Sequence, residues 1–279
     1  MCLALGGCVS GLPKALVQQG RGDFQGLVAD VESQYGSSEK APPLERALSC
    51  YAYYELRQYH KFQVCAKFIL AMDDPSFEFY PGMPKTYENA SEVKATVHGY
   101  LAQMYFEFLQ FDKAIAEADK SLELVEQAIE PGRKRYLRIT ALEAKALSLI
   151  NLGRGNEVGP LITTIEAQQS NIPADKTQLA KFRQSALAKI YFAQGDYVDA
   201  RKVLEERVSD VFGNILKQSA RVFTDLEDGA DTLAISNALP KLYMLDKAML
   251  ETGEIDQARA GYDKLLSQPV TKQFGDFYW

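Results

Sequence analysis

The stretch Gly195-Asp196-Tyr197, with Ala200 three residues further on, carries the pattern that decides the fold of this chain. Glycine adopts a positive φ without a steric penalty, so Gly195 and the polar Asp196 favour a tight turn at the end of a helix. The aromatic Tyr197 then begins a second helix and packs back on the first. The small Ala200 lets the two helices approach each other closely.

The same phrase recurs along the sequence: a Gly or polar residue, a polar residue, an aromatic or aliphatic residue, and a small or apolar residue three positions later. The other copies are Gly22-Asp23-Phe24 with Leu27, Arg57-Gln58-Tyr59 with Phe62, Leu109-Gln110-Phe111 with Ala114, Gly153-Arg154-Gly155 with Val158, and Gly253-Glu254-Ile255 with Ala258. Regular self-similarity indicates a repeat protein. We therefore expect six pairs of antiparallel helices.

Apolar stripes at helical spacing flank these phrases. Stripes before the turns include Leu101, Ala102, Tyr105, Ala146, Leu149, Leu187, Ala188, Tyr191, Leu245 and Met249. Stripes after the turns include Ala114, Ala118, Ser121, Val158, Ile162, Ile165, Ala200, Leu204, Ala258, Tyr262 and Leu265. Spacings of three and four residues predict the buried faces of amphipathic helices.

Two short motifs within the stripes resemble those of a known family. Leu101-Ala102-x-x-Tyr105 and Leu187-Ala188-x-x-Tyr191 match the first helix of the tetratricopeptide repeat, and Ala258-x-x-x-Tyr262, followed by Pro269, matches the second. The sequence thus resembles the tetratricopeptide repeat family. The resemblance implies an all-α fold, a right-handed superhelical solenoid of about six antiparallel helix-turn-helix units that occupies residues 11–279.

The repeat spacing is irregular. From Phe24 to Tyr59 is 35 residues, near the basic period of the family, whereas the later steps are 52, 44, 42 and 58 residues. Steps of 42 to 44 residues predict longer helices or longer loops. The 52-residue step contains three prolines and no helical stripe, which predicts an inserted loop near residues 72–90. The 58-residue step predicts an extra helical segment, or an extended second helix, near residues 211–238.

Composition and charge restrict the function. The chain is 47% hydrophobic and 24% charged, with a net charge of −6, so it has no general attraction for nucleic acid or anionic lipid. A basic cluster, Arg133, Lys134, Arg135 and Arg138, follows Pro131-Gly132, where a helix should start. We interpret this cluster as a solvated helix end rather than a phosphate site or a site for an acidic peptide.

No motif of catalysis, metal binding or cofactor binding occurs. The four cysteines include no CxxC pair, and the sequence has no HExxH, GxSxG or Gly-rich phosphate loop. His60 and Cys65 are five residues apart on one predicted helix, so they point in different directions. We predict that the chain is not an enzyme and needs neither metal nor cofactor.

The cysteines raise two structural questions. Cys50 and Cys65 lie nearly symmetrically about the turn at Arg57-Gln58, so they either form a disulfide in an oxidising compartment or remain two buried thiols. Leu5-Gly6-Gly7-Cys8 looks like the lipobox of a bacterial lipoprotein, although only Met1 to Leu5 precede it and no basic region does. Residues 1–10 are therefore either a flexible N-terminus or the remnant of a lipoprotein signal.

The family resemblance implies that a protein or peptide segment binds in a concave groove lined by the first helices. The positions expected to face this groove are Gly99, Tyr100, Gln103, Phe106, Glu143, Ala144, Leu147, Ser185, Ala186, Lys189, Phe192, Tyr243, Met244, Lys247 and Leu250. The candidate ligand residues among them are Tyr100, Gln103, Phe106, Glu143, Lys189, Phe192, Tyr243 and Lys247. Only two are basic and none is Asn, which excludes a clamp for a terminal carboxylate and favours an apolar or amphipathic segment. Alternatively, some of these aromatic residues pack between adjacent units.

The function predicted from sequence is a non-catalytic scaffold for protein–protein interaction. The tail Phe274-Gly275-Asp276-Phe277-Tyr278-Trp279 resembles the tetratricopeptide halves of bacterial proteins that carry a C-terminal CHAT domain, a caspase-like fold. One alternative is therefore the recognition half of a larger protease or signalling protein. A second alternative is a lipoprotein of the bacterial envelope, tethered to the membrane only through a lipid on Cys8. The expected location is the bacterial cytoplasm or, with the lipid, the envelope.

Overall fold

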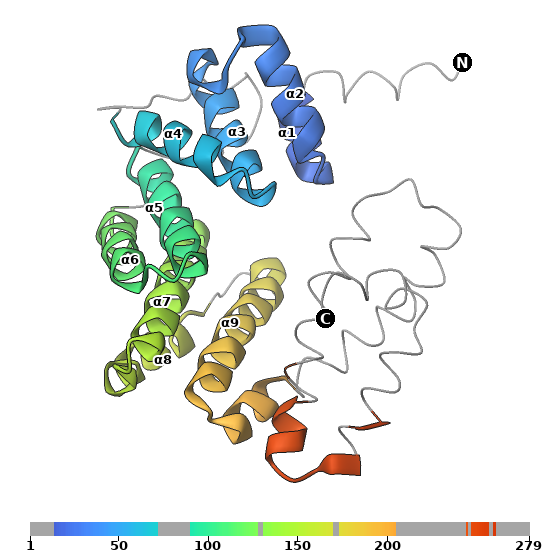
Figure 1. Cartoon of the computed structure of the whole chain (residues 1–279), viewed down its shortest axis with the longest axis vertical. Coiled ribbons are helices and arrows are strands. Elements are labelled where there is room, and N and C mark those ends of the chain that lie inside the picture. Colours follow the sequence, from blue (N-terminus) through green and yellow to red (C-terminus); the bar gives the residue numbers. More distant parts are fainter. Residues whose placement is uncertain are drawn as a thin grey trace. The chain divides into compact units, whose positions relative to one another are not determined.

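The computed structural model describes residues 14–71, 90–127, 131–169, 173–204, 244, 247–256 and 259–260. Within these ranges every regular element is a helix and no residue lies in a strand (Figure 1). The predicted helical class is therefore confirmed for this part of the chain. Residues 72–89 of the loop predicted near residues 72–90 lie outside the described residues, and Ala90 is helical. Also outside are residues 1–10 with Cys8, the predicted extra helical segment, the tail at residues 274–279, Tyr243 and Ala258.

The chain forms two units, Met1–Ala141 and Leu142–Trp279, with their boundary inside one helix. The helices are α1 (Lys14–Arg21), α2 (Phe24–Tyr35), η1 (Ser38–Lys40), α3 (Pro43–Glu55), α4 (Tyr59–Leu70), α5 (Ala90–Glu107), α6 (Phe111–Val125), α7 (Pro131–Asn151), η2 (Gly155–Glu157), α8 (Gly159–Glu166) and α9 (Pro173–Gln194). Residues 197–204 and 247–251 are also helical. The boundary between the units falls within α7. This helix starts at Pro131, and the sequence predicted a helix start at this place.

All six predicted turns are confirmed, and they share one backbone geometry. The first residue of each phrase has a positive φ: 73° at Gly22, 55° at Arg57, 57° at Leu109, 73° at Gly153, 78° at Gly195 and 86° at Gly253. Its N–H donates to the carbonyl three residues back, and the N–H of the second residue donates to the carbonyl five residues back. This paired bonding is the Schellman motif, which satisfies the last carbonyls of a helix.

The packing role assigned to the last residue of each phrase is also confirmed where that residue is described. The side chain is fully buried in all five such cases, Leu27, Phe62, Ala114, Val158 and Ala200. Most of the described stripe residues agree, because Leu101, Ala102, Ala118, Ala146, Leu149, Ile165, Leu187, Ala188 and Leu204 are buried. Tyr105, Ile162, Tyr191 and Met249 are half-buried. The spacing therefore identified the faces on which the helices meet.

The long repeat steps have a simple structural origin in the later helices. α7 has 21 residues and α9 has 22, whereas α3 has 13 and α4 has 12. Of the two predicted explanations for steps of 42 to 44 residues, the structure thus has longer helices. The fourth phrase differs from the others, because the short helix η2 follows its turn. The helix α8 begins only after η2 and has Pro160 in its first turn.

The pair α5 and α6 shows how two helices run on either side of such a turn. Ser91 Oγ donates to Gln127 Oε1 at 2.8 Å at the open end, and His98 Nδ1 lies 2.5 Å from Glu117 Oε2 closer to the turn. As residue numbers rise along α5, the partner numbers fall along α6. The two helices are therefore antiparallel, and they lie side by side in Figure 1.

Candidate protein-binding surface

Two of the predicted ligand residues on α5 contact the first helix of the preceding pair, α3. The ring of Tyr100 lies between those of Tyr51 and Tyr54, with centroid distances of 5.5 and 4.7 Å. The hydroxyl of Tyr54 donates to Gln103 Oε1 at 2.8 Å. Tyr100 and Gln103 are therefore half-buried, and each presents only part of its side chain to solvent.

The first helices of the later pairs also contact one another. A Cβ atom at Gly99 of α5 would lie 3.9 Å from Thr140 Cγ2 of α7. Lys189 Nζ on α9 lies 2.6 Å from Glu143 Oε1 on α7, and their side chains are 44% and 12% exposed. In the first unit, side-chain contacts or near neighbours thus link α3 to α5 and α5 to the part of α7 before Leu142, and in the second unit a contact links the rest of α7 to α9. We call these four helices the first-helix row.

Two further candidates, Phe106 and Phe192, pack against their own turns. The ring centroids of Phe106 and Phe111 are 5.7 Å apart, and those of Phe192 and Tyr197 are 5.4 Å apart. In both pairs the aromatic residue that begins the second helix packs back on the first, as the phrase predicts. Both phenylalanines are half-buried, and so is the candidate Lys247.

Three positions expected to face the groove are instead buried, so this part of the prediction is wrong. Gly99 lies against Ser121 and Thr140, and Ala144 and Ala186 are almost completely covered. Gly99 and Ala144 are each next to a candidate ligand residue in the sequence, and Ala186 lies three residues before Lys189. Successive residues in a helix are about 100° apart, so a neighbour of a surface residue can point between the helices.

An aromatic row that the sequence prediction overlooked extends the surface around Tyr100. Ring contacts connect its members at centroid distances of 4.7 to 6.1 Å, and the members are Phe24, Tyr51, Tyr100, Tyr54, Tyr59 and Phe108. Tyr51 and Tyr54 of α3 are three residues apart, the spacing that places side chains on one face of a helix. This spacing was a usable signal, although the family motif does not include it.

A carboxylate fixes one end of the aromatic row. The hydroxyl of Tyr59 donates to Glu107, and Arg57 Nη1 lies 3.7 Å from the same carboxylate. Burial raises the pKa of Tyr59 to about 12, and the bond to Glu107 contributes to this rise. Tyr59 therefore stays neutral at physiological pH and holds its ring in place.

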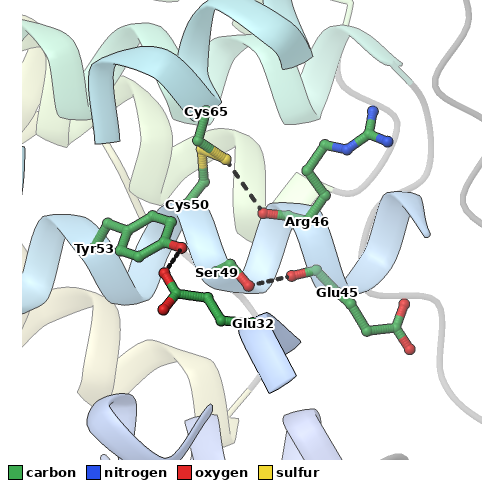
Figure 2. The surroundings of a disulfide bond; sticks show 7 residues. All are labelled: Glu32, Glu45, Arg46, Ser49, Cys50, Tyr53 and Cys65. Carbon is green, nitrogen blue, oxygen red and sulfur yellow. Dashed lines mark hydrogen bonds between the residues drawn. A yellow bond between two sulfur atoms is a disulfide. The ribbon is translucent and has the colours of Figure 1, made fainter. Parts of the chain in front are cut away.

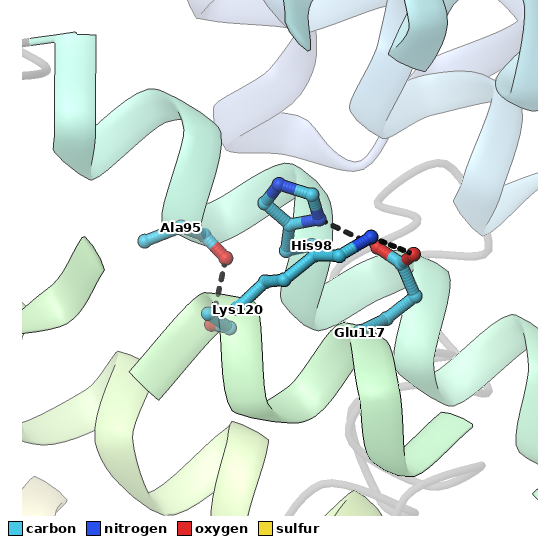
Figure 3. A network of polar contacts seen from close by, with 5 residues as sticks. Ala95, His98, Glu117 and Lys120 are labelled. Atoms are coloured by element: carbon cyan, nitrogen blue, oxygen red, sulfur yellow. Dashed lines mark hydrogen bonds and ion pairs between the residues drawn. The ribbon is translucent and has the colours of Figure 1, made fainter. Parts of the chain in front are cut away.

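A polar cluster inside the α5–α6 pair is a second feature that the sequence prediction overlooked, and no short motif marks it (Figure 3). His98 and Lys120 both contact the carboxylate of Glu117, at 2.5 and 2.9 Å, and Ser121 Oγ donates to the carbonyl of Ala95 at 2.8 Å. Burial raises the pKa of Glu117, but the hydrogen bonds from His98 and Lys120 outweigh it and hold the pKa below its usual value. The cluster joins the two helices of this pair.

Cys50 and Cys65 form a disulfide that joins α3 to α4 (Figure 2). Their Cα atoms are 5.7 Å apart, a usual separation for a disulfide. Both side chains are buried, and Cys65 Sγ lies 3.5 Å from the carbonyl oxygen of Arg46. Of the two alternatives for this cysteine pair, the structure has the bridged form.

The basic cluster at the start of α7 is partly neutralised within the chain. Lys134 Nζ lies 3.1 Å from Glu126 Oε2, and Arg138 contacts the other oxygen of the same carboxylate. Hydrogen bonds from Lys134 and Arg138 lower the pKa of Glu126. The cluster does lie at the start of a helix, but its four side chains are half-buried rather than fully solvated.

The described residues contain neither a metal-binding cluster nor a helix suited to cross a membrane. In this part of the chain, no three His, Cys, Asp or Glu side chains are grouped so that they could hold a metal ion. None of the helices described here has the length and apolar character to cross a membrane. No family model, curated protein or solved structure matches the chain.

Proposed function

We propose that the chain is a non-catalytic scaffold, a solenoid of about six tetratricopeptide-like helix pairs that binds a segment of another protein along the first-helix row. The observation that carries this proposal is that first helices are neighbours within each unit, through Tyr54–Gln103 and Gly99–Thr140 in the first and through Glu143–Lys189 in the second. In stacked repeats each unit contacts only its neighbours, and corresponding helices line one face.

The chemistry of the first-helix row indicates the kind of segment that binds. Tyrosine rings supply rigid apolar area, and Tyr100 loses little conformational freedom on binding because Tyr51 and Tyr54 already hold it. The Glu143–Lys189 pair adds one charge of each sign. Such a surface suits an amphipathic segment that inserts one or two bulky apolar residues and carries few charges.

Peptide selection on the intact chain tests the proposal. A library of random short peptides is displayed on phage and selected on the purified protein, and the dissociation constants of the selected peptides are measured by fluorescence anisotropy. Gln103→Ala and the charge swap Glu143→Lys/Lys189→Glu should each lower the affinity of the peptides that bind this face about tenfold, equivalent to about 1.4 kcal/mol. The swap keeps an ion pair but reverses the charges that the peptide meets.

A matched control separates binding from folding. Lys202 is an exposed lysine that follows the fifth turn, outside the first-helix row, so Lys202→Ala should leave every affinity unchanged. Circular dichroism should give the same melting temperature for the charge swap as for the parent. If all selected peptides bind both row variants as tightly as they bind the parent, the first-helix row is not the binding face.

The disulfide supports a second candidate function, a membrane-tethered lipoprotein of the bacterial envelope. Disulfides persist mainly in oxidising compartments, and Cys50–Cys65 is buried in the α3–α4 pair. This proposal places the scaffold outside the cytoplasm, anchored through a lipid on Cys8. Radioactive palmitate fed to expressing cells should label the protein but not Cys8→Ala, and an unlabelled parent protein would count against the anchor.

A further inference from the structure

The six turns share one backbone geometry but differ in the residue that adopts the positive φ. Four of them place glycine there, at φ of 73° to 86°, whereas Arg57 and Leu109 adopt 55° and 57°. A side chain with a Cβ atom is sterically disfavoured in the left-handed region, and leucine lacks the polar group that helps Asn or Asp to adopt it. Leu109 is therefore the least suited of the six residues to its backbone.

Burial does not compensate for this unfavourable backbone. Leu109 is 73% exposed and the preceding Phe108 is 47% exposed, so neither side chain gains much from the core of the protein. The ring of Phe108 meets that of Tyr59 edge-on, at a centroid distance of 5.2 Å, and Glu107 holds Tyr59 in place. We call Tyr59, Phe108 and Leu109 the turn-edge patch. It is a small apolar surface on a rigid support.

We propose that the turn-edge patch is a docking site for a short apolar segment of a partner protein, separate from the first-helix row. A residue kept in an unfavourable conformation and left in solvent contributes more to an external contact than to the fold. Phe108 and Leu109 would receive one bulky apolar side chain of the partner, and Tyr59 would support the contact from behind.

The surroundings of the patch favour this occupant over others. Arg57 pairs with Glu107, and Lys113, which donates to Gln110, is balanced by the neighbouring Asp112. The charge of Glu55 also acts on Tyr59, so the rim has no net positive charge to attract an anionic membrane or nucleic acid. A stable dimer needs about 800 Å² from each partner, more than three side chains provide. A short segment with one apolar anchor fits an area of this size.

The substitution Leu109→Gly tests the proposal directly. Glycine suits the left-handed backbone, so the melting temperature should equal or exceed that of the parent. Among the peptides selected from the random library on the parent chain, one class should bind Leu109→Gly and Phe108→Ala at least tenfold more weakly. Val198→Ala is the matched control, because it removes an exposed apolar side chain beside another turn, and it should leave the affinities of that class unchanged.

The outcomes separate this proposal from the binding function of the first-helix row. Peptides of the turn-edge class should keep their affinity for the Glu143→Lys/Lys189→Glu swap, whereas peptides of the first-helix row should keep theirs for Leu109→Gly. Unchanged binding of all peptides to Leu109→Gly would overturn the proposal. A large fall in the melting temperature of Leu109→Gly would also overturn the proposal, because Leu109 would then contribute to the stability of the fold. Analytical ultracentrifugation measures whether the parent is a dimer. A parent dimer that dissociates on this substitution would overturn the proposal, because the patch would then bind a second copy of the chain and not a segment of a partner protein.

Discussion

The pairs α3–α4 and α5–α6 have the same turn geometry, yet different interactions hold their helices together. The helices of the first pair are short, 13 and 12 residues, and the Cys50–Cys65 disulfide crosses between them. Those of the second pair have 18 and 15 residues and are joined without a covalent bond. There, Ala114 and Ala118 are fully buried, and Glu117 bonds across to His98.

The comparison separates two kinds of information in the sequence. The turn depends on a few consecutive residues, so the same phrase produces the same Schellman motif in both pairs. The helices of a pair are held together by residues that are distant in sequence. Several kinds of interaction can hold them. A short pair buries less surface, and a cross-link adds stability by restricting the unfolded chain.

The largest difference between the two pairs should appear when the disulfide is removed. The bridge closes a loop of 15 residues, for which the chain-entropy model gives a contribution of about 3 kcal/mol. The double variant Cys50→Ala/Cys65→Ala should therefore unfold at a markedly lower urea concentration than the oxidised parent. Equilibrium unfolding followed by circular dichroism measures this shift.

A reductant provides the control for this experiment. Dithiothreitol in the urea series should lower the midpoint of the parent towards that of the variant, while the variant itself should not respond. Any remaining difference under reducing conditions reports the packing of the two buried side chains rather than the bond. A parent midpoint that is the same with and without dithiothreitol would show that the α3–α4 pair does not depend on a cross-link.

The fold could be predicted from sequence to the extent that local signals control it. Gly195-Asp196-Tyr197 and its five relatives located the six turns described above, because a positive φ and a following helix start are properties of three or four residues. The length of α9 and the state of the cysteines could not be assigned in the same way. A period of 42 residues fits longer helices as well as longer loops, and symmetry about a turn does not fix the redox state of Cys50 and Cys65.

The next largest effect should come from overpacking the α5–α6 pair, which relies on close approach. Ala118 is fully buried on α6, so Ala118→Leu forces three more carbon atoms between the helices and should cost about 1–3 kcal/mol. The urea midpoint should fall accordingly. Ala116 provides the matched control, because the same substitution on the exposed face of the same helix should change stability by less than about 0.5 kcal/mol.

The two alanine variants also test the packing assigned to the phrase. Equal midpoints for Ala118→Leu and the parent would mean that α5 and α6 tolerate a wider separation than the structure has. Equal losses for Ala118→Leu and Ala116→Leu would place the contact on another face of α6. Either result would remove the distinction between a pair held by small residues and a pair held by a disulfide.

The candidate surface was less predictable than the fold. The spacing identified most of the buried stripe residues, but it did not separate Gly99 from Tyr100, two neighbouring residues of which the first is buried and the second half-buried. The contacts of Tyr54 with Gln103 and of His98 with Glu117 join residues 49 and 19 positions apart, and no short motif encodes them. The sequence showed only that Leu109 stands where most copies of the phrase have glycine. The structure then showed that this position has a positive φ and that the side chain of Leu109 is exposed.

The smallest expected effect concerns the polar cluster of the α5–α6 pair and depends on pH. The pKa of Glu117 lies below its usual value of 4.5 in the folded chain, since the bonds from His98 and Lys120 outweigh burial. A carboxyl group whose pKa falls on folding stabilises the protein above the unfolded pKa, and this contribution disappears as the pH falls through the folded pKa. Replacing Glu117 by Gln should therefore cost about 1 kcal/mol near neutral pH and progressively less below about pH 4.5.

Glu123, which is exposed on the same helix, provides the matched control. The variant Glu123→Gln removes one negative charge from α6 but leaves the polar cluster unchanged. Urea midpoints of the parent and both variants should be measured from neutral to acidic pH. Glu117→Gln should approach the parent on acidification, whereas Glu123→Gln should follow the parent at every pH. If the difference between Glu117→Gln and the parent stayed constant into the acid range, Glu117 would contribute through its shape and packing rather than its charge. The α5–α6 pair would then be held by close packing alone, and its contrast with the disulfide-bridged pair would rest on Ala114 and Ala118.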